Sequence, residues 1–300
     1  MRRGLVLTVL MAIGSLTVGT TAYQALPQPA LDATRIEQVK DNLYVITGSD
    51  PTNREAFSGG NTGVFITDAG VVVVDTKLAG WGDVLLERIR TVTDKPVVAI
   101  INTHTHGDHT GSNAFFEPSV DIVAHANTQI NMQRMEAFQG AGAAYLPKRT
   151  FTDRMSLGAG SGQIDLYHFG PGHTDGDAFV VYPSLRVMQT GDMFPWKDAP
   201  FIDRANGGSG LEYPNTLAKA LAGVTNVDTI VPGHMPVTTR SAMEQYQQFM
   251  TDLVAAVRDV KDNGRTVEQA VASIDLTSRY PEFKTNRMQA AIEAIYEELD

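Results

Sequence analysis

The chain contains no cysteine among its 300 residues. Disulfide bonds, thiolate metal ligands and a cysteine nucleophile are therefore excluded, and so is a bacterial lipoprotein, whose lipid is attached to a cysteine. Any bound metal must be held by nitrogen and oxygen atoms, which suits zinc, manganese or iron(II).

Positive charge is also in deficit. The chain has 24 Lys and Arg against 34 Asp and Glu, a formal net charge of -10. An acidic surface argues against nucleic acid and against anionic membranes as partners. A small-molecule substrate stays compatible with it, because the charge inside a pocket can differ from the overall balance. The sequence predicts no particular oligomeric state.

Only one long apolar run is present, and it lies at the start of the chain. Arg2 and Arg3 precede an uncharged apolar run over residues 5–18, and small residues follow up to Ala22 and Ala25. This pattern predicts a signal peptide over residues 1–25, cut near Ala22 or Ala25. A retained anchor is the alternative, but the run is shorter than the roughly 20 residues that a spanning helix needs. We therefore expect a periplasmic or secreted protein, exported by the general or the twin-arginine route, that leaves the membrane after cleavage.

Short strand-like runs alternate with helical segments through residues 26–300, without an internal repeat or a dividing linker. This predicts one layered domain of the α/β or α+β class. The continuous β-branched run over residues 71–74 predicts a strand buried on both faces, and Asp68-Ala69-Gly70 before it predicts a hairpin. The other expected strands span residues 43–46, 63–66, 97–101, 122–124, 164–169, 178–182, 185–189 and 229–231.

Helical spacing of apolar residues appears after the hairpin and again at the C-terminal end. Leu85, Ile89 and Val92 mark one helix. A long helix follows residues 246–260, with Thr239 or Ser241 as its N-cap and Gly264 as its end. Two more helices are expected near residues 267–274 and 283–298, and a helical insert over residues 132–145 is a candidate lid.

Four potential metal ligands occur within six residues, directly after the expected strand 97–101. His104 and His106 are two positions apart, so on an extended chain they point the same way. Asp108 and His109 follow Gly107, where the chain must turn, so this pair reaches a second point. The spacing predicts two neighbouring metals better than one.

Three further candidates follow strand-like runs in the same manner. His173 and His234 each stand behind a glycine, and so does Asp192. Loops at the ends of strands commonly carry functional side chains. Packing alone gives strand ends no reason to collect histidine and aspartate, so the pattern predicts a metal site.

The run His104-x-His106-x-Asp108-His109, followed by His173, Asp192 and His234, resembles the metallo-β-lactamase superfamily over about residues 38–236. The resemblance implies an α/β fold, a four-layer αββα sandwich with the metal site at one edge, filling residues 26–300 as one hydrolase domain. It also implies that His104, His106 and His173 hold one metal, that Asp108, His109 and His234 hold the other, and that Asp192 bridges them.

The implied activity is that of a dinuclear zinc-dependent hydrolase, with iron or manganese as possible replacements for zinc. Two zinc ions share a water and lower its pKa, and the bridging hydroxide attacks a small ester, lactone, thioester or amide. Asp108 orients the nucleophile and can relay a proton. Asp108 and Asp192 are therefore the expected catalytic residues.

The position of Asp192 bears on the substrate. The best-known β-lactamase branch carries a cysteine there, whereas an aspartate is typical of glyoxalase II-like thioesterases, lactonases and phosphodiesterases. β-Lactam hydrolysis stays open, because export fits it. The same ligands would also suit an iron-dependent sulfur dioxygenase or a non-catalytic metal-binding protein.

Several neighbouring residues are weaker candidates. Asp75 is equally consistent with orienting a ligand histidine and with capping a turn. Thr174 and Asp177 are expected to fix the loop of His173. We interpret His125 and His168 as structural, because lone histidines usually are.

The loop after Asp192 contains aromatic and cationic side chains. Phe194, Trp196 and Phe201 are expected to pack the loop, with contact to an apolar substrate as the alternative. Lys197 or Arg204 is a candidate for binding a substrate carboxylate.

Overall fold

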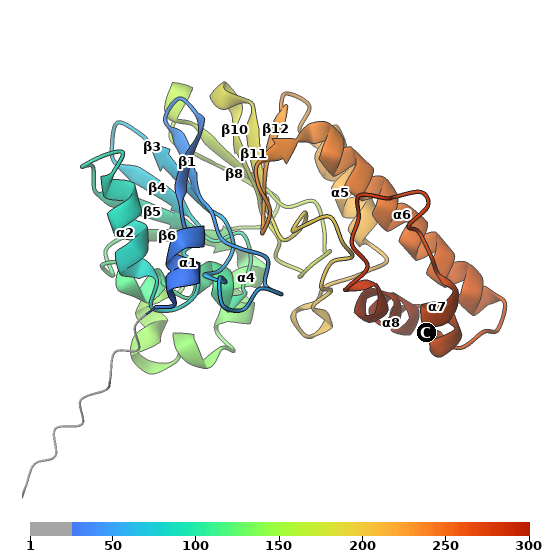
Figure 1. Ribbon diagram of the computed structural model, residues 1–300. Helices are drawn as coiled ribbons and strands as arrows, with labels where there is room; N and C mark the ends of the chain where they lie inside the picture. Colours follow the sequence, from blue (N-terminus) through green and yellow to red (C-terminus); the bar gives the residue numbers. More distant parts are fainter. Residues whose placement is uncertain (1–25) are drawn as a thin grey trace, which may run out of the picture.

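A computed structural model describes residues 26–300, and the predicted signal peptide over residues 1–25 lies outside them. Two β-sheets stack face to face, with helices on both outer sides (Figure 1). The expected α/β four-layer αββα sandwich is therefore confirmed. Within residues 26–300, no helix is both long and apolar enough to cross a bilayer.

The first sheet has seven strands in sequence order, from β1 to β7. Its first four strands are antiparallel and its last four run parallel to one another. The strands are β1 (Ile36–Lys40), β2 (Leu43–Ile46), β3 (Thr62–Ile66), β4 (Val71–Val74), β5 (Val97–Ile101), β6 (Asp121–His125) and β7 (Arg149–Phe151).

The second sheet has six strands in the order β13-β12-β11-β10-β9-β8. Its single parallel pair, β11 and β12, ends at the same edge of the sandwich as the parallel strands of the first sheet. The strands are β8 (Arg154–Leu157), β9 (Ile164–Tyr167), β10 (Phe179–Tyr182), β11 (Val187–Gly191), β12 (Thr229–Pro232) and β13 (Thr238–Thr239).

Three apolar clusters hold the layers together: one between the two sheets, and one between each sheet and its outer helices. The strand β4 contributes to two of them, because Val72 and Val74 face the second sheet while Val71 and Val73 face the outer helix α2 (Gly82–Arg90). The strand is buried on both faces and pairs with β3 in a hairpin, as its sequence predicts. The outer face of the second sheet is covered by α5 (Tyr213–Gly223), α6 (Arg240–Asp262), α7 (Val267–Ser273) and α8 (Met288–Glu298).

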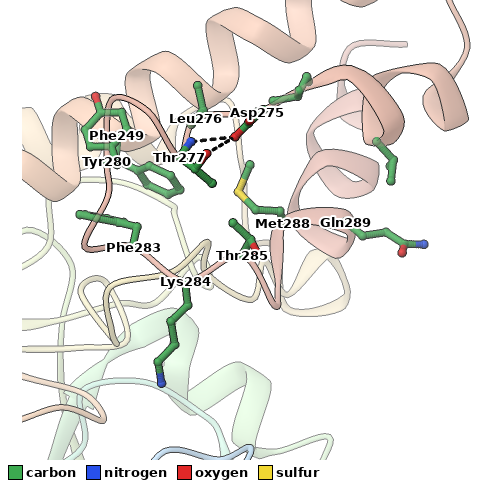
Figure 2. A pocket seen from close by; sticks show the side chains of 12 residues that line it. Phe249, Asp275, Leu276, Thr277, Tyr280, Phe283, Lys284, Thr285, Met288 and Gln289 are labelled. Atoms are coloured by element: carbon green, nitrogen blue, oxygen red, sulfur yellow. Dashed lines mark hydrogen bonds between the residues drawn. The ribbon is translucent and has the colours of Figure 1, made fainter.

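The C-terminal helices agree only partly with the expectation. The long helix α6 begins after the N-cap Thr239, whose side chain accepts from the Ala242 amide, and it ends just before Gly264 at φ +66°. The last helix begins at Met288 and not at Phe283. Phe283 instead packs its ring against Phe249 at 4.6 Å, beside a small cavity that Figure 2 shows.

The expectation of a helical insert over residues 132–145 is wrong. The helix α4 (Ala126–Met132) ends there, and two short 3-10 turns follow, Glu136–Phe138 and Gly140–Tyr145. The backbone at Gly140 has a φ of +55°, which breaks a right-handed helix. The two remaining helices are α1 (Gln28–Ala33) and α3 (Gly107–Thr110), and α3 carries part of the site.

Candidate metal centre

The loop after β5 turns between its two pairs of candidate ligands. His106 is extended, with φ -63° and ψ 146°, and the short helix α3 starts at Gly107. His104 and His106 therefore belong to an extended segment, whereas Asp108 and His109 belong to a helical turn. The side chains of Asn102 and Asn113 hold the base of this loop together through a hydrogen bond of 2.8 Å.

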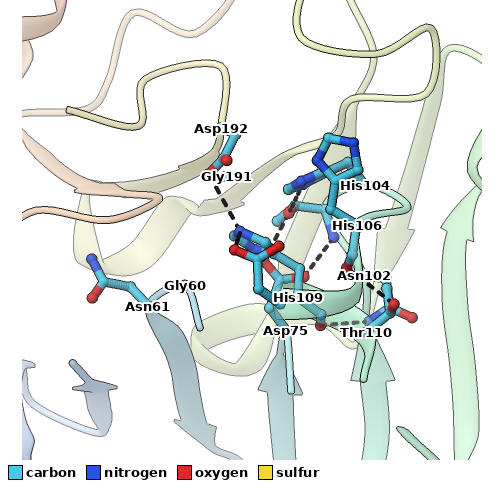
Figure 3. Close-up of polar contacts among 12 residues, drawn as sticks. Gly60, Asn61, Asp75, Asn102, His104, His106, His109, Thr110, Gly191 and Asp192 are labelled. Atoms are coloured by element: carbon cyan, nitrogen blue, oxygen red, sulfur yellow. Dashed lines mark hydrogen bonds and ion pairs between the residues drawn. The ribbon is translucent and has the colours of Figure 1, made fainter. Parts of the chain in front are cut away.

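The structure brings all seven predicted residues to one place. Their ligand atoms form three overlapping groups, and within each group all atoms lie within 4.8 Å of one another. The groups are His104, His106 and His173; His104, His109 and Asp192; and Asp108, His109 and His234. Figure 3 shows part of this cluster, with His104, His106 and His109 close together and a dashed line joining His109 to Asp192.

In the three-histidine group, the outer ring nitrogens are hydrogen-bonded and the inner ones face one another. His106 Nε2 lies 2.7 Å from Asp203 Oδ2, and His173 Nδ1 lies 2.7 Å from the Phe201 carbonyl oxygen. A carboxylate and a carbonyl can only accept, so these outer nitrogens carry the protons. His106 Nδ1 and His173 Nε2 are then two bare acceptors 2.9 Å apart. Such a pair is stabilised by a cation between its members.

The imidazole of His104, the third of this group, is also held by a hydrogen bond to its outer nitrogen. Thr103 Oγ1 donates to Asp75 Oδ2 over 2.7 Å and accepts from His104 Nδ1 over 3.0 Å. His104 Nε2 is thereby left unprotonated. It is buried and has no hydrogen-bond partner among residues 26–300. An unprotonated imidazole nitrogen in this position can donate its lone pair to a metal ion.

The second group gathers Asp108, His109 and His234. His109 Nδ1 lies 2.7 Å from Asp75 Oδ2, which leaves its Nε2 free and 3.3 Å from His234 Nε2. Asp108 Oδ2 lies 3.6 Å from His109 Nε2 and 3.4 Å from His234 Nε2. Asp75 also accepts from the Thr103 amide, so it both orients a histidine and caps a turn.

Asp192 lies between the two groups. Its Oδ1 is 3.3 Å from His109 Nε2, and its Oδ2 is 3.2 Å from His234 Nε2 and 3.7 Å from His173 Nε2. The backbone at Gly233 lies so close to the Asp192 side chain that a Cβ atom at Gly233 would be 2.0 Å from Asp192 Oδ1. A glycine before His234 is therefore required sterically.

Burial and the cluster's own charges set the protonation states. Burial, together with the nearby His106, lowers the pKa of His173 to about 4, and burial with His109 and His173 nearby lowers the pKa of His104 well below its usual value. Burial would also lower the pKa of His109, but the carboxylates of Asp192, Asp108 and Asp75 raise it well above the usual value. The site thus combines the neutral imidazoles of His104 and His173 with carboxylates that favour a positive charge at His109, which is a cation-binding environment.

A buried lysine fastens the loop between β2 and β3 against the cluster. Lys77 Nζ is fully buried and donates to the carbonyl oxygens of Ile46, Thr47 and Gly60 over 3.2, 3.0 and 2.8 Å. A Cβ atom at Gly60 would lie 2.2 Å from His109 Cε1, so only glycine lets the loop come this close. No local sequence pattern marks Lys77, Asp203 or the Phe201 carbonyl as part of the site, and none of the three was predicted.

Of the weaker candidates, Thr174 and Asp177 lie in the loop of His173, whereas His125 and His168 lie apart from the ligand groups. The Thr174 amide and hydroxyl donate to Asp177, so this pair fixes the loop of His173 as expected. His125 and His168 stack on each other at 4.0 Å, outside the three ligand groups.

The aromatic residues after Asp192 also differ from one another. Phe194 packs in the core against Tyr246, as expected. Phe201 is 49% exposed and lies 5.8 Å from the His106 ring, so it borders the site and does not pack its loop. Lys197 forms an ion pair with Glu282, and Arg204 Nη1 lies 2.9 Å from Glu298 Oε2, so each of these candidates already has a carboxylate partner.

Comparisons with known proteins agree with the fold. The family model described as the metallo-beta-lactamase superfamily matches residues 56–234. Metallo-beta-lactamase type 2 of Elizabethkingia meningoseptica is 28% identical over 232 residues, which cover 73% of this chain and 85% of that protein. 2,4-Dinitroanisole O-demethylase subunit alpha of Nocardioides sp. (strain JS1661) is 32% identical over 143 residues, 43% of this chain and 41% of that one.

Solved structures show the same fold at low identity. The DIM-1 metallo-beta-lactamase superposes with a TM-score of 0.61 at 19% identity, covering 73% of this chain and 97% of that one. The sec-alkylsulfatase Pisa1 from Pseudomonas sp. superposes with a TM-score of 0.71 at 14% identity, covering 88% of this chain and 50% of that one. The fold and the match of the family model over most of the chain lead to one conclusion. This chain belongs to the metallo-β-lactamase superfamily and is a metal-dependent hydrolase.

Proposed function

We propose that the protein is a dinuclear zinc hydrolase of a small ester, lactone, thioester or amide. The observation that carries the proposal is Asp192, whose two carboxylate oxygens face histidines of both ligand groups. His104, His106 and His173 would hold one ion, Asp108, His109 and His234 the other, and Asp192 both. Zinc suits this set because all its donors are imidazole nitrogens and carboxylate oxygens.

Two bound zinc ions would supply a water acidified towards neutral pH and polarise the bond to be broken. The chain's own residues prepare this chemistry. Asp75, Asp203 and the Phe201 carbonyl hold the imidazoles in the orientation and tautomer that a metal needs. Asp108 is more exposed than Asp192 (side chains 20% and 6%), so it reaches the open side and can accept a proton from the attacking water.

Hydrolysis of β-lactams is the second candidate, and the metallo-β-lactamase relatives favour it. Metallo-beta-lactamase type 2 of Elizabethkingia meningoseptica aligns with most of this chain. Asp192 favours hydrolysis of an ester, lactone or thioester instead, because the resemblance puts a cysteine at this position in the best-known β-lactamase branch.

A substrate screen on metal-replete protein lacking residues 1–25 tests both candidates. Metal content is measured first, and about two zinc ions per chain are expected. Turnover of a lactone, a thioester, an aryl ester and a chromogenic cephalosporin is then compared with that of Asp108→Ala. Faster hydrolysis of the cephalosporin than of any ester would favour the second candidate. Tightly bound iron with oxygen uptake on a persulfide would contradict both.

We also propose that the protein is exported. The support is the basic start and the apolar run over residues 5–18 in the sequence. Mass spectrometry of the protein recovered from the periplasm should give a chain that begins after Ala22 or Ala25. Recovery of the full-length chain from the membrane fraction would contradict this.

A further inference from the structure

A cavity of about 470 Å³ borders the metal centre at His234, the ligand candidate among its lining residues. Three of its walls come from the loop after β2, the loop after Asp192 and the turn after His234. The fourth wall is the segment over residues 282–287, which we call the C-terminal strap. The strap lies beyond residues 56–234, the part of the chain that the family model matches.

The strap is held in place at several points. Phe283 packs on Phe249 and Tyr280 at ring distances of 4.6 and 5.4 Å, and Figure 2 shows Lys284 pointing away from this apolar group. The Lys284 amide donates to the Lys197 carbonyl over 2.9 Å. The Arg287 amide donates to Asp198 Oδ1 over 3.4 Å. The position of Arg287 at the cavity is therefore fixed by the packing and the hydrogen bonds of the strap.

Most charges that line the cavity already have partners. Lys197 forms an ion pair with Glu282, and Lys284 Nζ lies 3.3 Å from Asp50 Oδ2. The Asp198 carboxylate accepts from the Ala199 amide over 2.7 Å. Arg287 differs, because among residues 26–300 no carboxylate oxygen lies within 4.0 Å of its guanidinium. Its charge acts on Asp198 from farther away, where it offsets part of the rise that burial causes in the pKa of that carboxyl.

The guanidinium of Arg287 lies over a ring that contacts the metal centre. Its Cζ is 4.0 Å from the centre of the Trp196 ring, and the Trp196 ring is 5.4 Å from the His234 ring. Stacking on an indole holds the guanidinium flat and leaves its N–H edge free to donate. A planar carboxylate is the acceptor that matches this edge with two parallel hydrogen bonds.

We propose that Arg287 is a specificity-determining residue that binds a carboxylate of the substrate. The substrate is then a small ester, lactone, thioester or amide with a carboxylate at one end, its scissile bond at the metal centre and its apolar middle along Trp196. The proposal deepens the proposed function and rests on it for the identity of the reacting bond. The C-terminal strap thereby contributes directly to the substrate site.

A matched pair of substrates tests this proposal. The p-nitrophenyl monoester of glutaric acid carries a free carboxylate, and its methyl ester does not. Arg287→Gln should lower kcat/KM for the acid about tenfold, mainly through KM, and change it less than twofold for the methyl ester. Arg287→Lys should fall between, because it keeps the charge and loses the planar fork. Arg279→Gln is the control, since Arg279 also lies over an aromatic ring, Tyr280, but pairs with Asp252 and does not line this cavity.

Equilibrium binding separates this proposal from the hydrolase proposal. The chain has two tryptophans, so a Trp81→Phe background reports Trp196 fluorescence alone. In metal-loaded protein, phenylacetate should bind about ten times more weakly to Arg287→Gln, with no change for phenylacetamide. Contact of phenylacetate with the metals is common to both proteins and cancels. Equal effects on the charged and neutral ligands would overturn the role of Arg287, even where hydrolysis proceeds. A selective loss of phenylacetate binding supports it, even where none of the esters is hydrolysed.

Discussion

Asp203 offers a way to test the metal centre one ligand group at a time. Its Oδ2 lies 2.7 Å from His106 Nε2, and no contact joins it to His109 or His234 within residues 26–300. Replacing Asp203 with asparagine keeps the shape of the side chain and removes its charge. We expect Asp203→Asn to weaken metal binding at the three-histidine group while leaving the Asp108–His109–His234 group unchanged.

The size of the effect follows from the contact. A carboxylate that orients a ligand histidine typically contributes 10- to 100-fold to metal affinity, or about 1.4–2.7 kcal/mol. Asparagine can still accept a hydrogen bond, so we expect about tenfold for Asp203→Asn and more for Asp203→Ala. Burial would raise the pKa of Asp203, but hydrogen bonds from His106 and Asn206 hold it below its usual range. The carboxylate is therefore ionised throughout neutral pH, and the effect should not vary between pH 6 and 9.

Competition with a chromophoric zinc chelator measures both affinities in one titration. The wild type and the control Asp228→Asn, whose exposed carboxylate pairs with Arg186, should give the same two binding steps. Asp203→Asn should shift only one step. Equal weakening of both steps, or no change in either, would refute the assignment of Asp203 to a single ligand group.

Three further predictions concern stability. Lys77→Met should lower the free energy of unfolding by about 3 kcal/mol in urea titrations, because three backbone carbonyls lose their hydrogen-bond donor. The control Lys95→Met removes one exposed hydrogen bond and should lower it by less than about 1 kcal/mol. Similar losses of stability in the two variants would contradict the prediction. Burial and the neighbouring His168 lower the pKa of His125 from 6.5 to about 4, so the folded state resists protonation and loses stability as the pH falls from 6.5 to 4. His125→Phe should remove about 1 kcal/mol of that loss, and an unchanged difference from wild type between pH 7 and 4.5 would count against it. Thr266→Ala should cost about 1 kcal/mol and speed hydrogen exchange in α7, because it breaks the capping box with Gln269; unaltered exchange there would be inconsistent with the cap.

The strands that the sequence predicts well are those whose residues are buried by both neighbouring layers. Residues 71–74 form β4 with the expected bounds, because every residue is β-branched and both faces are covered. The strands β1, β7, β8 and β13 were not predicted, because they are short and partly exposed and depend on hydrogen bonds from a neighbouring strand. The helix α5 was not predicted either, although Pro214 stands in its first turn, where proline favours a helix and does not break it.

The candidate site divides in a similar way. The seven ligand candidates could be predicted because each follows a strand end and four of them are within six residues. Asp203 could not, because its partner His106 is 97 residues away and no local pattern marks the contact. Arg287 and Lys77 are likewise defined by tertiary contacts, the first by stacking on Trp196 and the second by three carbonyl oxygens.

The ligand candidates come from both halves of the sandwich. His104, His106, Asp108 and His109 follow a strand of the seven-stranded sheet, and His173, Asp192 and His234 follow strands of the six-stranded sheet. Any ion held by this cluster would therefore cross-link two sheets that otherwise meet through apolar side chains and a few hydrogen bonds, such as that from Asn61 to the Pro232 carbonyl. The free energy of metal binding would add to the stability of the folded sandwich, because separating the two sheets would require the ion to dissociate.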